Sequence, residues 1–147
     1  MPTPLLKLGG LSRATGVSVP TLGRWFDRGT IKQSRRDKAS TGHGDHRQFS
    51  HNTVVQIAIA RKLIELGIAA GHANKCAAVF TDDGQTGRSS GELFPCGKTF
   101  LIVGPEGAFV RNAFHDTPLS DVSKDGVCMI VELNRVVEHV NSILKVN

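Results

Sequence analysis

The stretch LSRATGVSVPTLGRWFDRGTI, from Leu11 to Ile31, decides the fold of the N-terminal half of the chain. Just before and within it, Leu8, Leu11 and Ala14 recur at a regular spacing of three residues, which places them on one face of a helix. The pattern therefore predicts a first helix from Leu8 to Thr15.

A second helix is expected after a tight turn. Gly16 supplies the left-handed residue at which helices commonly end, Ser18 can cap the next helix, and Pro20 fits its first turn. This helix is expected to end near Arg28, before Gly29. Two helices joined in this way predict a helix-turn-helix, with a plain αα-hairpin inside a core as the alternative.

The stretch GDHRQFSHNTVVQIAIARKLIELG, from Gly44 to Gly67, predicts a β-wing and a third helix after the first two. A strand at Ile31 to Gln33, a basic hairpin tip at Ser34 to Asp45 and a returning strand at His46 to Phe49 would form the wing. Ser50 is then expected to cap an amphipathic helix that Gly67 closes.

Positive charge is concentrated in the same half of the chain. The 147 residues carry a formal net charge of +5, and the sequence pI is about 9.5. Residues 1–66 carry eleven Lys and Arg against four Asp and Glu, a net of +7, whereas residues 67–147 carry seven against nine, a net of −2. A basic half that coincides with a helix-turn-helix pattern predicts double-stranded DNA as the partner.

The second helix is expected to read DNA bases, because a major groove admits one helix whose exposed N-terminal side chains meet base edges. We expect Ser18, Thr21 and Arg24 to face the bases. Arg24 is the strongest candidate, since its guanidinium can bond bidentately to guanine O6 and N7. Val19 and Leu22 are expected to face the protein core.

Basic residues around this helix are expected to hold phosphates and fix the register without reading sequence. Several of them lie in the hairpin tip of the wing, for which a solvated surface turn is the alternative. Of the aromatic pair Trp25 and Phe26, one is expected to pack inward and the other to lie along the DNA backbone. The predicted phosphate contacts are Arg13, Trp25, Arg28, Arg35, Arg36, Lys38 and Arg47.

The segments TGVSVPTLGRWFDRGTI and GDHRQFSHNTVVQIAIARKLIELGI resemble the winged helix-turn-helix domain of the MerR family of bacterial transcription regulators. The resemblance covers residues 7–80, about half of the chain. It implies that Ser18, Thr21 and Arg24 belong to the recognition helix and that Arg47 contacts phosphate at the wing.

Two departures from the family pattern change what is expected. Gly23-Arg24-Trp25-Phe26 stands where the usual family has an Arg-Tyr-Tyr run after Thr-Leu, and this variant is similar to the excisionase and phage-type branch of the superfamily. The usual long antiparallel dimerisation helix is also missing from the pattern. Promoter untwisting and the familiar effector pocket are therefore not carried over to this chain.

The C-terminal part predicts a small α/β module. An alanine-rich segment predicts a helix at Ala70 to Phe80, and the Gly/Ser/Asp-rich segment after it has the composition of a linker or exposed loop. Strand-like runs are expected at Thr99 to Gly104, Ala108 to Phe114 and Val127 to Val131, with a PEG turn between the first two. An amphipathic helix at Leu133 to Val146 is expected to close the chain.

These elements together predict an α+β fold. Residues 1–80 would form a MerR-like winged helix-turn-helix DNA-binding domain, residues 81–92 a linker or exposed loop, and residues 93–147 a small α/β dimerisation or sensing module. The apolar stripe of the last helix could serve an intersubunit face or cover an internal sheet.

No catalytic constellation is evident in the sequence. GPEG, from Gly104 to Gly107, lacks the Gly-Lys-Ser/Thr ending of a phosphate loop, and His115 and Asp116 are only neighbours in a loop. A metal site would need three or four histidines and cysteines to converge. We therefore expect no enzyme, no cofactor and no metal. The histidines and cysteines considered are His43, His46, His51, Cys76, Cys96 and Cys128.

Cysteine spacing and hydropathy indicate the compartment. The three cysteines form no CxxC pair, which indicates a reducing environment, and no apolar run reaches membrane-spanning length. We expect a cytoplasmic, nucleoid-associated homodimer that binds specific double-stranded DNA, regulates transcription through contact with RNA polymerase and touches no membrane. The alternatives are an excisionase-like or phage-type architectural protein and a metabolite- or metal-responsive sensor.

Overall fold

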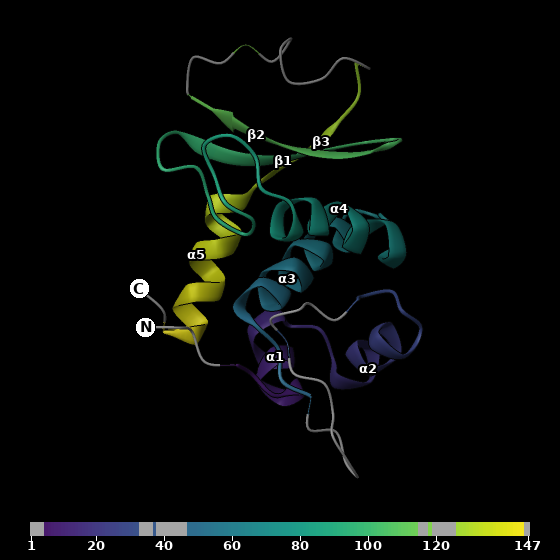
Figure 1. Cartoon of the computed structure of the whole chain (residues 1–147). Coiled ribbons are helices and arrows are strands. Elements are labelled where there is room, and N and C mark those ends of the chain that lie inside the picture. Colours follow the sequence, from purple (N-terminus) through teal and green to yellow (C-terminus); the bar gives the residue numbers. More distant parts are fainter. Residues whose placement is uncertain (1–4, 33–36, 38–46, 115–117, 119–125, 146–147) are drawn as a thin grey trace.

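The computed structural model describes residues 5–32, 37, 47–114, 118 and 126–145. Within them lie five helices and a three-stranded antiparallel sheet, so the α+β class is confirmed. Figure 1 shows the sheet at one end of the molecule, α1 and α2 at the other, and α3 between them. The elements are α1 (Leu8–Thr15), α2 (Val19–Asp27), α3 (His51–Glu65), α4 (Ala70–Asp82), β1 (Lys98–Gly104), β2 (Gly107–Ala113), β3 (Met129–Glu132) and α5 (Leu133–Leu144).

The turn between α1 and α2 forms as predicted. Gly16 adopts a left-handed backbone with φ 74°, and its N–H donates to the carbonyl of Ser12. Leu22 of α2 is fully buried, as expected. The prediction for Val19 is wrong, because this side chain is 42% exposed. Val17, two residues earlier, takes the buried position beside the turn instead.

The predicted β-wing is described only in part. Ile31 is buried in a bend and Lys32 follows it in an irregular segment, so neither forms the expected strand. Phe49 forms an antiparallel bridge with Leu6, with N–H to carbonyl distances of 2.8 and 2.7 Å. Apart from Asp37, the hairpin tip lies outside the described residues.

α3 is the central helix of the molecule. Ser50 caps it as predicted, since its hydroxyl accepts from the N–H of Thr53 at 3.4 Å. Every residue from Thr53 to Ala60 is buried, because α1, α4 and α5 all pack against this helix. The helix-turn-helix therefore shares its main packing partner with the C-terminal part of the chain.

The sheet has the order β2-β1-β3, and its three strands agree with the predicted ones. Leu101 in β1 pairs with Val110 on one side and Val131 on the other, and all three side chains belong to the core. α4 and α5 pack against this sheet. β3 begins at Met129, two residues later than expected.

α5 returns from the sheet to pack against α1 and α3 (Figure 1). Its buried residues include Leu133, Val136 and Val140, in agreement with the predicted stripe. One cluster of buried residues runs from Leu11 in α1 to Val140, so the two parts of the chain share a core. None of the helices in the described part of the chain is long and apolar enough to cross a membrane.

The segment between α4 and β1 is held to α4 by a buried arginine. The side chain of Arg88 donates from Nη1 to the carbonyl of Phe80 at 3.1 Å and from Nε to Gln85 at 3.0 Å. Its Cζ lies 5.1 Å from the centroid of the Phe80 ring. Burial lowers the pKa of the Arg88 guanidinium, and the charge of Asp83 partly opposes this shift. A linker role for residues 81–92, and the domain division that depends on it, stay predictions.

Candidate nucleic-acid interface

The three predicted base-reading residues form one hydrogen-bonded chain at the start of α2. The Ser18 hydroxyl accepts from the N–H of Thr21 at 3.4 Å and donates to the Thr21 hydroxyl at 2.8 Å. Arg24 donates from Nη2 to the same Thr21 oxygen at 3.2 Å. Ser18 and Arg24 are exposed and Thr21 is half-buried, so the chain lies at the surface. The cap that begins the helix thus also holds the guanidinium of Arg24.

This arrangement gives α2 a polar recognition surface. The Thr21 hydroxyl oxygen accepts both side-chain bonds, so its own proton is available to donate outward. Arg24 uses one of its five N–H groups in the bond to Thr21, which leaves the others for a planar acceptor. Such a surface can present a guanidinium fork and a hydroxyl together to the edges of bases.

The opposite side of α2 is anchored by its aromatic residues. Trp25 and Phe26 are both half-buried and pack against the core cluster. The carbonyl of Trp25 also accepts from the N–H groups of Thr30 and Ile31, at 2.8 and 3.3 Å. The expectation that only one of the two rings packs inward is therefore wrong, because both help to cover the core. A phosphate contact by Trp25 stays a prediction.

Arg47 is held against α2 through an aromatic stack. The rings of Phe26 and Phe49 are stacked, with centroids 4.7 Å apart and an interplanar angle of 23°. The Cζ of Arg47 lies 5.4 Å from the Phe26 centroid, within the range of a cation–π contact. This contact places a predicted phosphate-binding arginine beside α2.

Asp37 contacts the N-terminus of α3, which the sequence pattern did not reveal. One carboxylate oxygen accepts from the N–H of Ser50 at 2.6 Å. The Thr53 hydroxyl donates to both carboxylate oxygens, at 3.0 and 2.8 Å. A carboxylate at this position is favoured by the partial positive charge of a helix N-terminus. Arg36 and Lys38, the neighbours of Asp37 in sequence, lie outside the described residues, as does Arg35.

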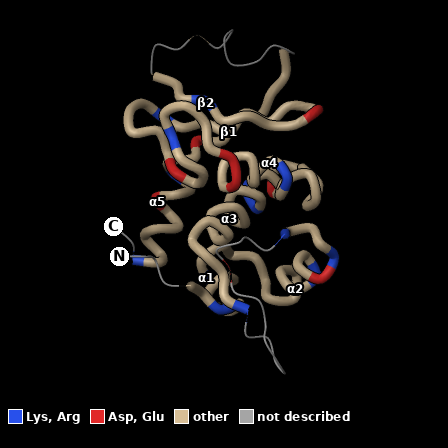
Figure 2. The backbone as a smooth tube through the Cα atoms, in the orientation of Figure 1, with Lys and Arg blue, Asp and Glu red and all other residues tan. Residues whose placement is uncertain are grey.

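The remaining predicted phosphate contacts lie at helix ends. Arg28 is exposed at the C-terminal cap of α2. Arg13 is exposed in the last turn of α1, where it lines a cleft with residues of α3 and α5 rather than joining the Ser18–Thr21–Arg24 group. Figure 2 shows Lys and Arg along α1 and α2 and the segments next to them, which agrees with the basic character of this half.

Histidines and cysteines are dispersed in the described part of the chain. No three His, Cys, Asp or Glu side chains converge there as metal ligands would. His51 bonds to Asn141, and Cys76 lies 3.6 Å from His72 within α4. Burial raises the pKa of the Cys76 thiol, which disfavours the thiolate that a metal would need. His43 and His46 lie outside the described residues.

Comparison with known proteins identifies the N-terminal part. The family described as MerR HTH family regulatory protein matches residues 6–77, a span that contains α1, α2, α3 and the first part of α4. A comparison of the sequence with curated proteins gave no match. The matched span agrees with the resemblance expected over residues 7–80 and contains the Ser18–Thr21–Arg24 group. Residues 6–77 are therefore a DNA-binding helix-turn-helix domain of the MerR family of transcription regulators.

Proposed function

We propose that the protein is a sequence-specific regulator that places α2 in the major groove of its DNA site. The observation that carries this proposal is the Ser18–Thr21–Arg24 chain at the surface of α2, in which the Thr21 hydroxyl accepts from Ser18 and from the Arg24 guanidinium. A positioned Arg can bond bidentately to guanine, which is worth about 1–3 kcal/mol of discrimination against the wrong base. Arg24 is the proposed guanine reader, and Ser18 and Thr21 position it and complete the contact.

The phosphate contacts of this proposal surround the recognition helix. Arg47 lies over Phe26 and so beside α2. Asp37 bonds to the N-terminus of α3, and Arg36 and Lys38 are its neighbours in sequence. Arg28 at the end of α2 is exposed. Together with Arg35, Arg13 and Trp25, these residues are proposed to hold the backbone on both sides of the groove, which gives affinity without sequence preference.

A homodimer is part of the proposal. On the face of the sheet opposite Leu101, the buried Ile102 pairs with Phe109 on one side and Ile130 on the other. Phe109 is 48% exposed and Ile130 is 42% exposed, so this face offers apolar area to a second copy. Two copies would read a two-fold symmetric site with half-sites about one helical turn apart. Nucleoid association and a contact with RNA polymerase would follow from action at promoters.

The proposal is tested by selecting binding sites from random duplexes with the wild type, Arg24→Ala and Arg47→Ala. Arg24→Ala should lose the preference for guanine at one position of the site, whereas Arg47→Ala should weaken binding to all duplexes and reduce the salt slope. Lys75 is an exposed residue of α4, and Lys75→Ala is the control for the loss of one positive charge. If both variants keep the base preference and the salt slope of the wild type, α2 does not bind the major groove in this way.

An architectural role is the second candidate, and one observation favours it. α4 ends at Asp82, and the chain then forms a sheet that packs back on the helices instead of continuing as a long helix. A protein built in this way could bend DNA at one locus without a coiled-coil dimer. Mapping of bound sites across the genome separates the two. Binding at many promoters supports the regulator, and binding at a single recombination or packaging site supports the architectural protein.

A further inference from the structure

A cleft of about 400 Å³ lies where the helix-turn-helix meets the last helix of the chain. It is lined by the C-terminal end of α1 with Gly16, by the C-terminal half of α3, and by one side of α5. Its volume falls in the range of sites that hold small molecules. The proposed base-reading residues Ser18, Thr21 and Arg24 do not line this cleft.

The cleft combines an apolar lining with cationic groups. Ala14, Ala58, Val136 and Ile143 supply the apolar part, and the first three of these are buried. The charged lining residues are all basic, and no Asp or Glu of the described residues lines the cleft. The cationic and titratable groups are Arg13, Arg61, Lys62, Arg135 and His139.

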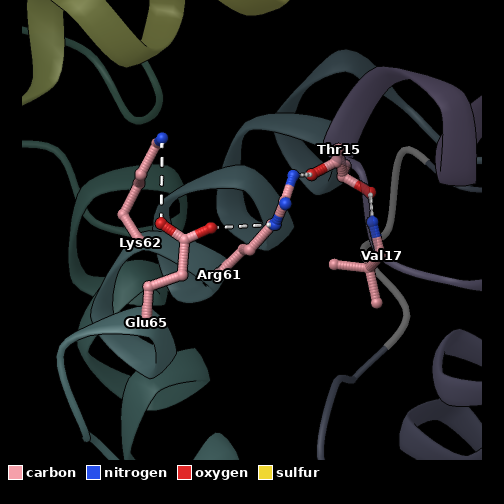
Figure 3. Close-up of polar contacts among 5 residues, drawn as sticks. All are labelled: Thr15, Val17, Arg61, Lys62 and Glu65. Atoms are coloured by element: carbon pink, nitrogen blue, oxygen red, sulfur yellow. Dashed lines mark hydrogen bonds and ion pairs between the residues drawn. The ribbon is translucent and has the colours of Figure 1, made fainter.

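Carboxylates outside the cleft neutralise only part of this charge. Glu65 pairs with Arg61 at 3.2 Å and with Lys62 at 4.0 Å (Figure 3). Glu132 pairs with Arg135 at 2.9 Å but is shared with Lys98 on the sheet. Four Lys and Arg side chains therefore line the cleft, whereas two carboxylates of the described residues pair with them from outside. One of these carboxylates, Glu132, also pairs with Lys98. The excess charge is positive, so the cleft favours an anion.

One of the cationic groups is fixed before any ligand arrives. Arg61 donates from Nη1 to the carbonyl of Thr15 at 3.1 Å, and its Nε pairs with Glu65 (Figure 3). Its guanidinium packs against the turn at Gly16, where an added Cβ would meet Nη1 at 1.8 Å. A ligand that binds next to a preorganised guanidinium loses less conformational entropy than one that must order a free side chain.

We infer that this cleft is a binding site for a small organic anion with an apolar body, bound between the helix-turn-helix and α5. The apolar body would cover Ala14, Ala58 and Val136, while the anionic group would meet the guanidinium and ammonium groups at the rim. A DNA backbone fits less well, because phosphates on a duplex surface can use rim cations but have no apolar group to fill the space between the helices. This inference does not depend on the proposed function of α2.

The first test compares two fluorescent probes on the full chain. 8-Anilinonaphthalene-1-sulfonate has an aromatic body and a sulfonate, and N-phenyl-1-naphthylamine has the same body without the charge. We expect saturable binding of the sulfonate at one site per chain, at least about tenfold tighter than the neutral probe. Equal affinity for the two probes would overturn the inference, since it would mean apolar binding alone.

Charge-neutral variants locate the site. Lys62→Gln with Arg135→Gln should weaken binding of the sulfonate by about tenfold, because two exposed cations are lost from the rim. Glu65 and Glu132 keep their other partners, Arg61 and Lys98, in this variant. Lys75→Gln with Lys32→Gln changes the net charge equally at two exposed residues outside the cleft. If both double variants weaken binding equally, the site is elsewhere and the inference fails.

A pair of substitutions at Ile143 tests the sign of the charge. This residue lines the cleft and is 37% exposed, so either substitution should leave the fold intact, as checked by circular dichroism. Ile143→Glu and Ile143→Lys lose the same apolar group but place opposite charges in the cleft. The Glu variant should bind the sulfonate at least about tenfold more weakly than the Lys variant. Equal binding would contradict an anion site.

The remaining outcome concerns DNA. The Lys62→Gln, Arg135→Gln variant is titrated with a duplex of mixed sequence at several salt concentrations. An unchanged salt slope together with weaker sulfonate binding supports the inference. A reduced slope with unchanged sulfonate binding would assign the rim cations to the DNA backbone and overturn it.

Discussion

His51 at the start of α3 and Asn141 in α5 are joined by a hydrogen bond of 2.6 Å between Nε2 and Oδ1. Because an amide oxygen can only accept, the imidazole donates from Nε2, which fixes its tautomer. The two residues are 90 positions apart in the chain. The bond therefore ties the helix that supports the DNA-binding domain to the helix that closes the C-terminal part.

Asn141→Ala should lower the free energy of unfolding by about 1 kcal/mol, because it leaves a half-buried N–H without its partner. The control is Ser142→Ala, the next residue of α5, whose exposed hydroxyl bonds only within the helix at 2.7 Å. Urea unfolding of the two variants measures the difference. If they unfold at the same urea concentration, the bond to His51 does not stabilise the contact between α3 and α5.

Asp37→Ala should weaken DNA binding although it makes the protein more basic. The substitution removes a negative charge, so general electrostatics predicts tighter binding. The contacts of Asp37 predict the opposite, because the variant loses the bonds from Ser50 and Thr53 that join residue 37 to the N-terminus of α3. Fluorescence anisotropy with a labelled duplex decides between the two directions. Glu92→Ala, at an exposed carboxylate before β1, is the control for charge.

Local features of α1 and α2 could be predicted from sequence, whereas contacts between distant segments could not. Gly16 and Ser18 act within a few residues of their partners, so their spacing alone indicated a turn and a cap. Asp37 caps a helix that begins fourteen residues later, and no local spacing encodes that. Ser50 was expected to cap α3 alone, and it shares this role with the carboxylate.

The same distinction explains the cleft and the error at Val19. In the sequence, Arg61 and Arg135 cannot be told from other basic residues on helices. They line the same cleft because α5 packs against α1 and α3. Val19 is apolar and helical, so periodicity favours burial. Val17 occupies the core position beside the turn instead. It precedes the first residue of α2, so the periodicity of that helix could not indicate it.

Gly16→Ala should destabilise the protein by about 1–2 kcal/mol, and Gly9→Ala should not. The backbone at Gly16 has φ +74°, which side chains disfavour, and an added Cβ would also displace the end of the flexible Arg61 side chain. Gly9 is helical in α1 and has no atom within 4 Å of an added Cβ, so alanine there should raise stability by up to about 1 kcal/mol. Thermal unfolding should therefore move in opposite directions. A Gly16→Ala variant as stable as the wild type would show that the left-handed backbone at this turn is not required.

Arg88→Ala tests whether the segment after α4 is a flexible linker or part of the packed structure. The guanidinium is buried against the Phe80 ring and bonds to the Phe80 carbonyl, at 3.1 Å, and to Gln85. Loss of hydrogen bonds from a charged group typically costs about 1–3 kcal/mol. Arg88→Lys should recover little of this, because an ammonium cannot reproduce the planar fork that reaches both partners. Urea unfolding with Lys98→Ala, an exposed residue at the start of β1, as control measures the cost. A change below about 0.5 kcal/mol, as expected for surface residues, would support the linker, and a larger one would mean that residues 81–92 hold α4 and the sheet together.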